Sequence, residues 1–177
     1  QDFSKSFRHS KIVDISYVRV DSLDFSNLLE VRKISITEDR KSNVKNLVLP
    51  SSPHLRQVYL KGLGCAFTIP FDNRIRVIGI KDCPKFTSFL HFDSIHSVYL
   101  ENLQITTLEG LGSGNRIVEI SCPSIIDFRV LRTCDKLVIG NCSGLHDLSP
   151  LRGIKDLTVN SPHHMPENME GVTNLTF

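Results

Sequence analysis

The sequence predicts a repeat solenoid that is mostly β: a right-handed coil with a parallel β-sheet on its concave face and extended or 3₁₀ return segments, in about eight or nine repeats. Three observations predict it. Apolar triplets recur about every twenty residues, and outward residues alternate with them, as in a strand with one buried face. About ten residues remain for each return, which is too few for a multi-turn α-helix.

The triplets keep a regular period over most of the chain. Their middle residues follow one another at steps of 20, 20, 20, 19, 20 and 18 residues. A closed globular α/β domain is the alternative, and it would need helices of about ten residues or more between its strands. The middle residues are Val58, Ile78, Val98, Val118, Leu137, Leu157 and Leu175.

Two earlier copies are less regular. The step from Ile34 to Val58 is 24 residues long, which indicates an enlarged repeat. We expect its return limb to carry Val44, Leu47 and Leu49. The two early triplets are Ile12/Ile15/Tyr17 and Val31/Ile34/Ile36.

At these residues the chain resembles the leucine-rich repeat superfamily. Residues 78–83 and 137–142 match the family's L-x-L-x-x-N/C segment, and residues 142–151 are similar to the return limb of short, irregular repeats. The resemblance covers about residues 12–177. It implies a solenoid whose concave sheet recognises a partner. Residues 137–159 also resemble the receptor L-domain type of β-helix.

The two ends are expected to differ. Residues 1–11 are expected to form an N-terminal cap or flank in which Phe3 and Phe7 cover the first coil. Residues 12–177 form the solenoid, which we expect to continue beyond 177 in the full-length protein. Val172, Leu175 and Phe177 have the pattern of a repeat strand, so we expect further repeats or another chain to cover this end.

Composition and charge narrow the function classes. Hydrophobic residues make up 40% of the chain and charged residues 23%, which excludes a disordered chain. No apolar run reaches the length of a membrane span. The net charge is only +2, although residues 1–85 carry +6 and residues 86–177 carry −4. Nucleic acid is therefore a poor candidate partner, whereas the charge asymmetry could steer another partner along the chain.

The cysteines favour an intracellular protein slightly, with a secreted protein as the alternative. There are five, an odd number without framework spacing, which predicts reduced and buried thiols. No C-x-x-C pair occurs, and we predict no metal site and no cofactor. His163, His164 and Met165 are expected to form a surface loop.

We predict no enzymatic activity. Cys83 and Cys142 share a repeat position and are expected to pack at turns, with no base at matching height on the ladder. The glycine-rich stretch 110–114 lacks the Lys-Ser/Thr of a phosphate loop and is expected to form a turn. The sequence contains no pair of carboxylates and no Ser/His/Asp order that would indicate catalysis.

The outward strand residues form the candidate partner-binding face. Tyr59 and Tyr99 are the expected anchors, since tyrosine and arginine are enriched at interface hot spots. A solvated face with scattered charge is the alternative. The apolar residues Val77, Ile117 and Val138 favour a protein partner over nucleic acid. The candidate residues are Lys33, Arg56, Gln57, Tyr59, Arg76, Val77, His96, Tyr99, Ile117, Glu119, Val138 and Thr158.

The sequence thus favours a non-catalytic module that binds another protein or peptide, within a larger receptor, effector or adaptor. Two alternatives stay open: an extracellular L-domain-like module for a ligand or glycan, and a structural scaffold subunit of a larger assembly. A third, weak nucleic-acid binding through the arginine residues that precede the strands, would show a steep dependence on salt.

Overall fold

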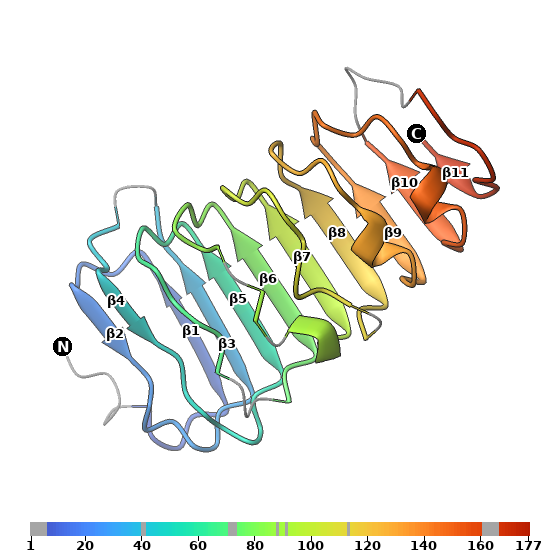
Figure 1. Cartoon of the computed structure of the whole chain (residues 1–177). Helices are drawn as coiled ribbons and strands as arrows, with labels where there is room; N and C mark the ends of the chain where they lie inside the picture. The colour runs from blue at the N-terminus through green and yellow to red at the C-terminus, as the bar shows by residue number, and fades with distance from the viewer. Residues whose placement is uncertain are drawn as a thin grey trace.

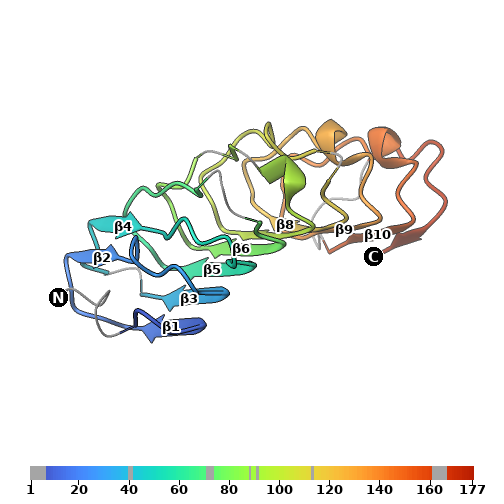
Figure 2. The same ribbon diagram turned by 90° about the horizontal axis from the view of Figure 1, so that it is seen from below.

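The chain winds into a β-solenoid of about eight turns, as the repeat period predicts. The computed structural model describes residues 7–39, 42–70, 74–87, 89–90, 92–112, 114–160 and 167–177. Each turn contributes a strand to one layer and a return segment to the other (Figures 1 and 2). The hydrophobic core lies between the two layers and runs the length of the solenoid.

The strand layer is a nine-stranded parallel sheet in which neighbours follow the order of the chain. Consecutive apolar triplets therefore lie side by side, and the middle residues pair in register from Val58 to Leu175. The strands are β1 (Ile12–Ser16), β3 (Lys33–Thr37), β5 (Gln57–Lys61), β6 (Val77–Lys81), β7 (Ser97–Glu101), β8 (Ile117–Ser121), β9 (Lys136–Ile139), β10 (Asp156–Val159) and β11 (Leu175–Thr176).

The expected frame of the first triplet is wrong. Val13 and Ile15 point inward and pair with Ile34 and Ile36, whereas Ile12 is 64% exposed and Tyr17 is 66% exposed. The inward frame therefore lies two residues earlier than expected, with Val13 and Ile15, rather than Ile15 and Tyr17, in the last two inward positions. Ile15 stays inward because side chains two residues apart in a strand share a face. Adjacent apolar residues at 12 and 13 conceal the correct frame.

The enlarged repeat carries a second, small sheet. Val44, Leu47 and Leu49 are buried on the return limb, as expected. There β2 (Ser22–Asp24) and β4 (Asn46–Val48) pair in parallel. Figure 1 shows this pair at the N-terminal end of the solenoid. Each strand has three residues and one buried side chain, too short a pattern to predict from alternation.

The later return segments contain 3₁₀ turns, one of the two conformations predicted. These are η1 (Phe92–Ser94), η2 (Arg129–Leu131) and η3 (Ser149–Leu151). Asp127 Oδ1 accepts a hydrogen bond from the Arg129 N–H (2.9 Å), and Asp147 Oδ1 accepts one from the Ser149 N–H (2.8 Å). A short polar side chain thus fixes the same point of successive coils.

The turn after each strand explains why one repeat step is 19 rather than 20 residues. Gly62, Asp82 and Asn102 adopt positive φ at this turn. The next residue then points into the core, as Cys83 does after Asp82. After β8 the buried residue is Cys122, which comes one position earlier in its repeat. The coil closes there without a left-handed residue.

Asn115 is a buried polar residue at a core position. Other coils have Leu55, Ile75 or Ile95 three residues before the middle strand residue. The Asn115 amide donates to the carbonyls of Phe92 (2.8 Å) and Ile95 (2.5 Å), and Asn115 Oδ1 accepts from the Gly112 N–H (2.7 Å). The side chain therefore ties two coils together and closes the turn predicted at the glycine-rich stretch.

The two ends of the solenoid are covered to different extents. Phe7 is half-buried and packs against the core, whereas Phe3 lies outside the described residues, so the N-terminal cap stays a prediction. At the other end Val172 and Leu175 are half-buried, and Phe177 is 56% exposed.

Candidate partner-binding face

The outward side chains of the sheet form columns that cross the strands. Because the register is uniform, one residue from each strand contributes to each column. We call the column through Lys33, Gln57, Val77 and Ile117 the first column. The central column contains Ser35, Tyr59, Gly79, Tyr99, Glu119, Val138 and Thr158. The third column contains Thr37, Lys61, Lys81, Glu101 and Ser121.

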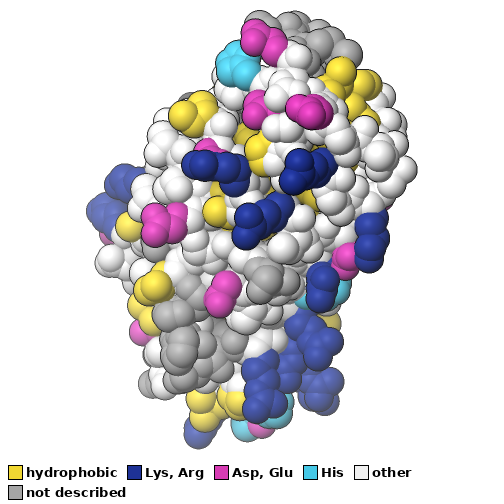
Figure 3. Space-filling model, turned by 45° about the vertical axis from the view of Figure 1, so that its right-hand side comes forward, with side chains coloured by type: hydrophobic (Ala, Val, Ile, Leu, Met, Phe, Trp, Pro, Cys, Tyr) yellow, Lys and Arg dark blue, Asp and Glu magenta, His cyan; other side chains and the backbone are white. Residues whose placement is uncertain are grey.

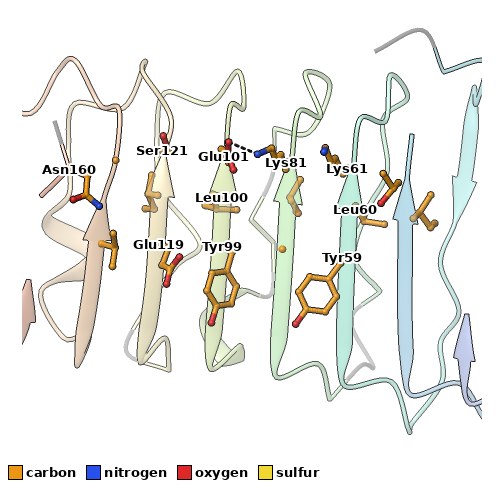
Figure 4. A pocket seen from close by; sticks show the side chains of 17 residues that line it. Tyr59, Leu60, Lys61, Lys81, Tyr99, Leu100, Glu101, Glu119, Ser121 and Asn160 are labelled. Carbon is orange, nitrogen blue, oxygen red and sulfur yellow. Dashed lines mark hydrogen bonds and ion pairs between the residues drawn. The ribbon is translucent and has the colours of Figure 1, made fainter. Parts of the chain in front are cut away.

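A groove of about 470 Å³ crosses the strands between the central and third columns. It extends from Thr37, at the end of β3, to Asn160, just after β10 (Figure 4). Of the predicted residues, it is lined by Tyr59, Tyr99, Glu119 and Val138. The others lie outside its lining: Lys33, Arg56, Gln57, Arg76, Val77, His96, Ile117 and Thr158.

Gly79 keeps the groove open between the two tyrosines. It lies between Tyr59 and Tyr99 in the central column. The Tyr59 ring lies against it, since a Cβ atom on Gly79 would stand 2.8 Å from Tyr59 Cδ1. Lys33 Nζ is 5.5 Å from the centroid of the same ring, within cation–π range. The Tyr59 side chain is thus held by both neighbouring strands.

The third column supplies the polar wall of the groove. Lys81 Nζ is 2.5 Å from Glu101 Oε1, and this hydrogen bond raises the pKa of Lys81. Lys61 has no ion pair with any described residue, and its side chain stands beside the Lys81–Glu101 pair (Figure 4). This wall was not predicted from the sequence, although its residues Lys61, Lys81 and Glu101 are the next outward positions after Tyr59, Gly79 and Tyr99.

A further column lies at the start of the strands. Backbone hydrogen bonds link its members, for example from the Arg32 N–H to the Lys11 carbonyl (2.7 Å) and from the Arg56 N–H to the Arg32 carbonyl (2.8 Å). We name its cationic part the basic row. The basic row consists of Lys11, Arg32, Arg56, Arg76, His96 and Arg116. The predicted residues Arg56, Arg76 and His96 belong to it, and Lys11 extends it to β1.

All five thiols are buried. All five cysteines are free, and burial raises the pKa of Cys83, Cys134 and Cys142 to about 11. These groups are therefore protonated at neutral pH, and a protonated thiol is a poor nucleophile. Their packing at and between the coils accounts for their place in the sequence.

The described ranges contain neither a metal-binding cluster nor a membrane-spanning helix. No cluster of three or more His, Cys, Asp or Glu side chains there is arranged to hold a metal ion. Nor does any helix in those ranges combine the length and apolar character needed to cross a membrane. His163, His164 and Met165 lie outside the described residues, so the surface loop stays a prediction.

Comparison with protein-family models, curated proteins and solved structures finds no match to this chain.

Proposed function

We propose that the concave face of this solenoid binds an extended segment of another protein without chemical change. The groove beside Tyr59 and Tyr99 carries this proposal. It spans seven strands, from β3 to β10, which corresponds to about 29 Å at the usual strand spacing. A stretch of about eight or nine extended residues has that length. A compact small molecule would contact only part of such a surface.

The sheet also suits recognition energetically. Its outward side chains stand on backbone that is hydrogen-bonded on both sides, so little ordering entropy is lost when a partner binds. Tyr59 and Tyr99 are half-buried, and aromatic residues in such settings contribute strongly to binding. The resemblance of the repeats to leucine-rich repeats supports the same proposal, since that family commonly serves in recognition.

A selection from a random displayed peptide library tests the proposal. Peptides enriched on the wild-type protein are measured against the double variant Tyr59→Ala/Tyr99→Ala. We expect the selected peptides to bind this variant at least about tenfold more weakly, because both hot-spot side chains are removed. Tyr17→Ala is the matched control, since Tyr17 is the third tyrosine of the chain and lies outside the groove.

Two outcomes would overturn the proposal. One is equal binding of the selected peptides to wild type and to the groove variant. The other is a library that yields no peptide above background. Circular dichroism of each variant checks that the repeat structure persists.

A further inference from the structure

The basic row places five Lys and Arg side chains, together with His96, along half of the molecule. Its six residues stand at the starts of six neighbouring strands, so they follow one another at about 4.8 Å. Like charges opposite one another in a sheet destabilise it. Arg32 and Arg76 form no ion pair with any residue that the structure describes. Lys and Arg side chains also gather along the lower right margin of Figure 3, on the side where the strands of Figure 1 begin.

At its C-terminal end the same column contains a carboxylate that pairs with the neighbouring cations. There the Asp135 carboxylate lies between Arg116 and Lys155. It forms ion pairs with Arg116 Nη1 at 3.6 Å and with Lys155 Nζ at 3.0 Å. Lys155 and then Arg116 lower the pKa of Asp135, so the carboxylate stays charged. In the first column Lys136 pairs with Asp156 at 3.5 Å. Cations near the start of β9 and β10 therefore meet carboxylates on neighbouring coils, whereas Arg32 and Arg76 meet none within the described part of the chain.

We propose that the basic row binds an acidic segment of a partner protein in extended form. This inference goes beyond the proposed function, because the basic row lies outside the lining of the groove, and it names the chemistry of the segment that the row binds. The row spans five strand spacings, or about 24 Å, which matches about seven extended residues. Carboxylates of the segment would neutralise the row, and its apolar side chains would contact the exposed Ile12 and the half-buried Val77 of the first column.

The neighbouring side chains favour a polypeptide over a nucleic acid or a sulfated glycan. Single-stranded nucleic acids are held by aromatic side chains on which bases stack. Neither the basic row nor the strand residues of the first column include Phe, Tyr or Trp, and the first column supplies the aliphatic residues Ile12, Val77 and Ile117. Aliphatic residues that are interspersed with polar ones beside a cationic row match a segment in which acidic and apolar residues alternate.

The probe is a fluorescein-labelled ten-residue peptide of alternating Asp and Leu, with a neutral twin in which Asn replaces Asp. Fluorescence anisotropy measures its binding to the whole chain. The test variant is Arg32→Gln/Arg76→Gln. The matched control is Arg132→Gln/Arg152→Gln, which removes two exposed arginines at the ends of η2 and η3 on the return side. Both variants lower the net charge equally.

We expect the acidic peptide to bind wild type more tightly than the neutral twin does. The basic-row variant should weaken binding of the acidic peptide about fivefold, the loss of two exposed charge contacts, and the control should change it less than about twofold. Affinity should fall as salt rises from about 0.05 M to about 0.3 M, because salt screens exposed charges. Thermal unfolding should show the basic-row variant no less stable than wild type, since repulsion is relieved.

Several results would overturn the inference. These are equal binding of the neutral twin, equal losses in the basic-row and control variants, or displacement of the peptide by a thymidine oligonucleotide or a heparin oligosaccharide at lower concentration than by the unlabelled peptide. If the basic-row variant binds normally while Tyr59→Ala/Tyr99→Ala loses its selected peptides, this inference fails and the proposed function stands. If the basic-row variant loses the acidic peptide while the selected peptides bind wild type and Tyr59→Ala/Tyr99→Ala equally, the proposed function fails and this inference stands.

Discussion

At the scale of single residues, Asn115 shows how a polar side chain can replace an apolar one in a repeat core. Its amide makes three hydrogen bonds to two coils while its exposed fraction is zero. The neighbouring coils have aliphatic residues at the equivalent position, so volume alone does not require asparagine. The hydrogen bonds therefore account for its presence.

Asn115→Leu tests this account. Leucine fills the space but leaves the carbonyls of Phe92 and Ile95 without their donor, so we expect the free energy of unfolding to fall by about 2–3 kcal/mol. Urea denaturation measures the change. Asn43→Leu, at an exposed asparagine, should alter stability by less than about 0.5 kcal/mol. A leucine variant at position 115 that is as stable as wild type would refute the account.

At the scale of the element, the return segments are fixed by local caps rather than by helix length. Asp127 and Asp147 occupy the same place in successive coils, and Asn168 Oδ1 accepts from the Glu170 N–H (3.0 Å) one coil later. Such side chains hold a tight turn that three residues of 3₁₀ helix could not maintain alone.

Asp147→Ala should therefore lower the free energy of unfolding by about 1 kcal/mol, through loss of the acceptor for the Ser149 N–H. Asp147→Asn keeps an acceptor oxygen and should recover most of this loss. Chemical denaturation of the two variants in parallel makes the comparison. Equal losses in both would show that charge, and not the hydrogen bond, stabilises the turn.

At the scale of the whole molecule, each coil contacts chiefly its two neighbours, so stability is distributed along the stack. Opening should begin at the ends. We expect amides of β7, such as Val98 and Leu100, to exchange at least about tenfold more slowly than those of β11, whose side chains are only half-buried or exposed. Hydrogen exchange followed by mass spectrometry measures this gradient. Uniform protection from β1 to β11 would contradict it.

The repetition of coils along the whole molecule determines which features of the fold and of the candidate face could be predicted from the sequence. The stack of coils was visible because the middle inward position of each strand repeats an apolar residue, from Val58 to Leu175. The frame of β1 was obscured by apolar residues on both faces, at Ile12 and Val13. In the candidate face, Tyr59 and Tyr99 stood out as aromatics. Lys61, Lys81 and Ser121 did not, because polar outward residues look alike whether they line a groove or face open solvent.

The strict alternation of inward and outward side chains separates stability from recognition. Exchanging outward residues leaves the inward ones untouched, so specificity can change coil by coil while the scaffold stays the same. Transferring the outward residues of β5, Gln57 and Tyr59, to the matching positions Lys136 and Val138 of β9 would copy one element of the surface further along the molecule. A family of variants with new binding preferences could be built in this way from one unchanged interior.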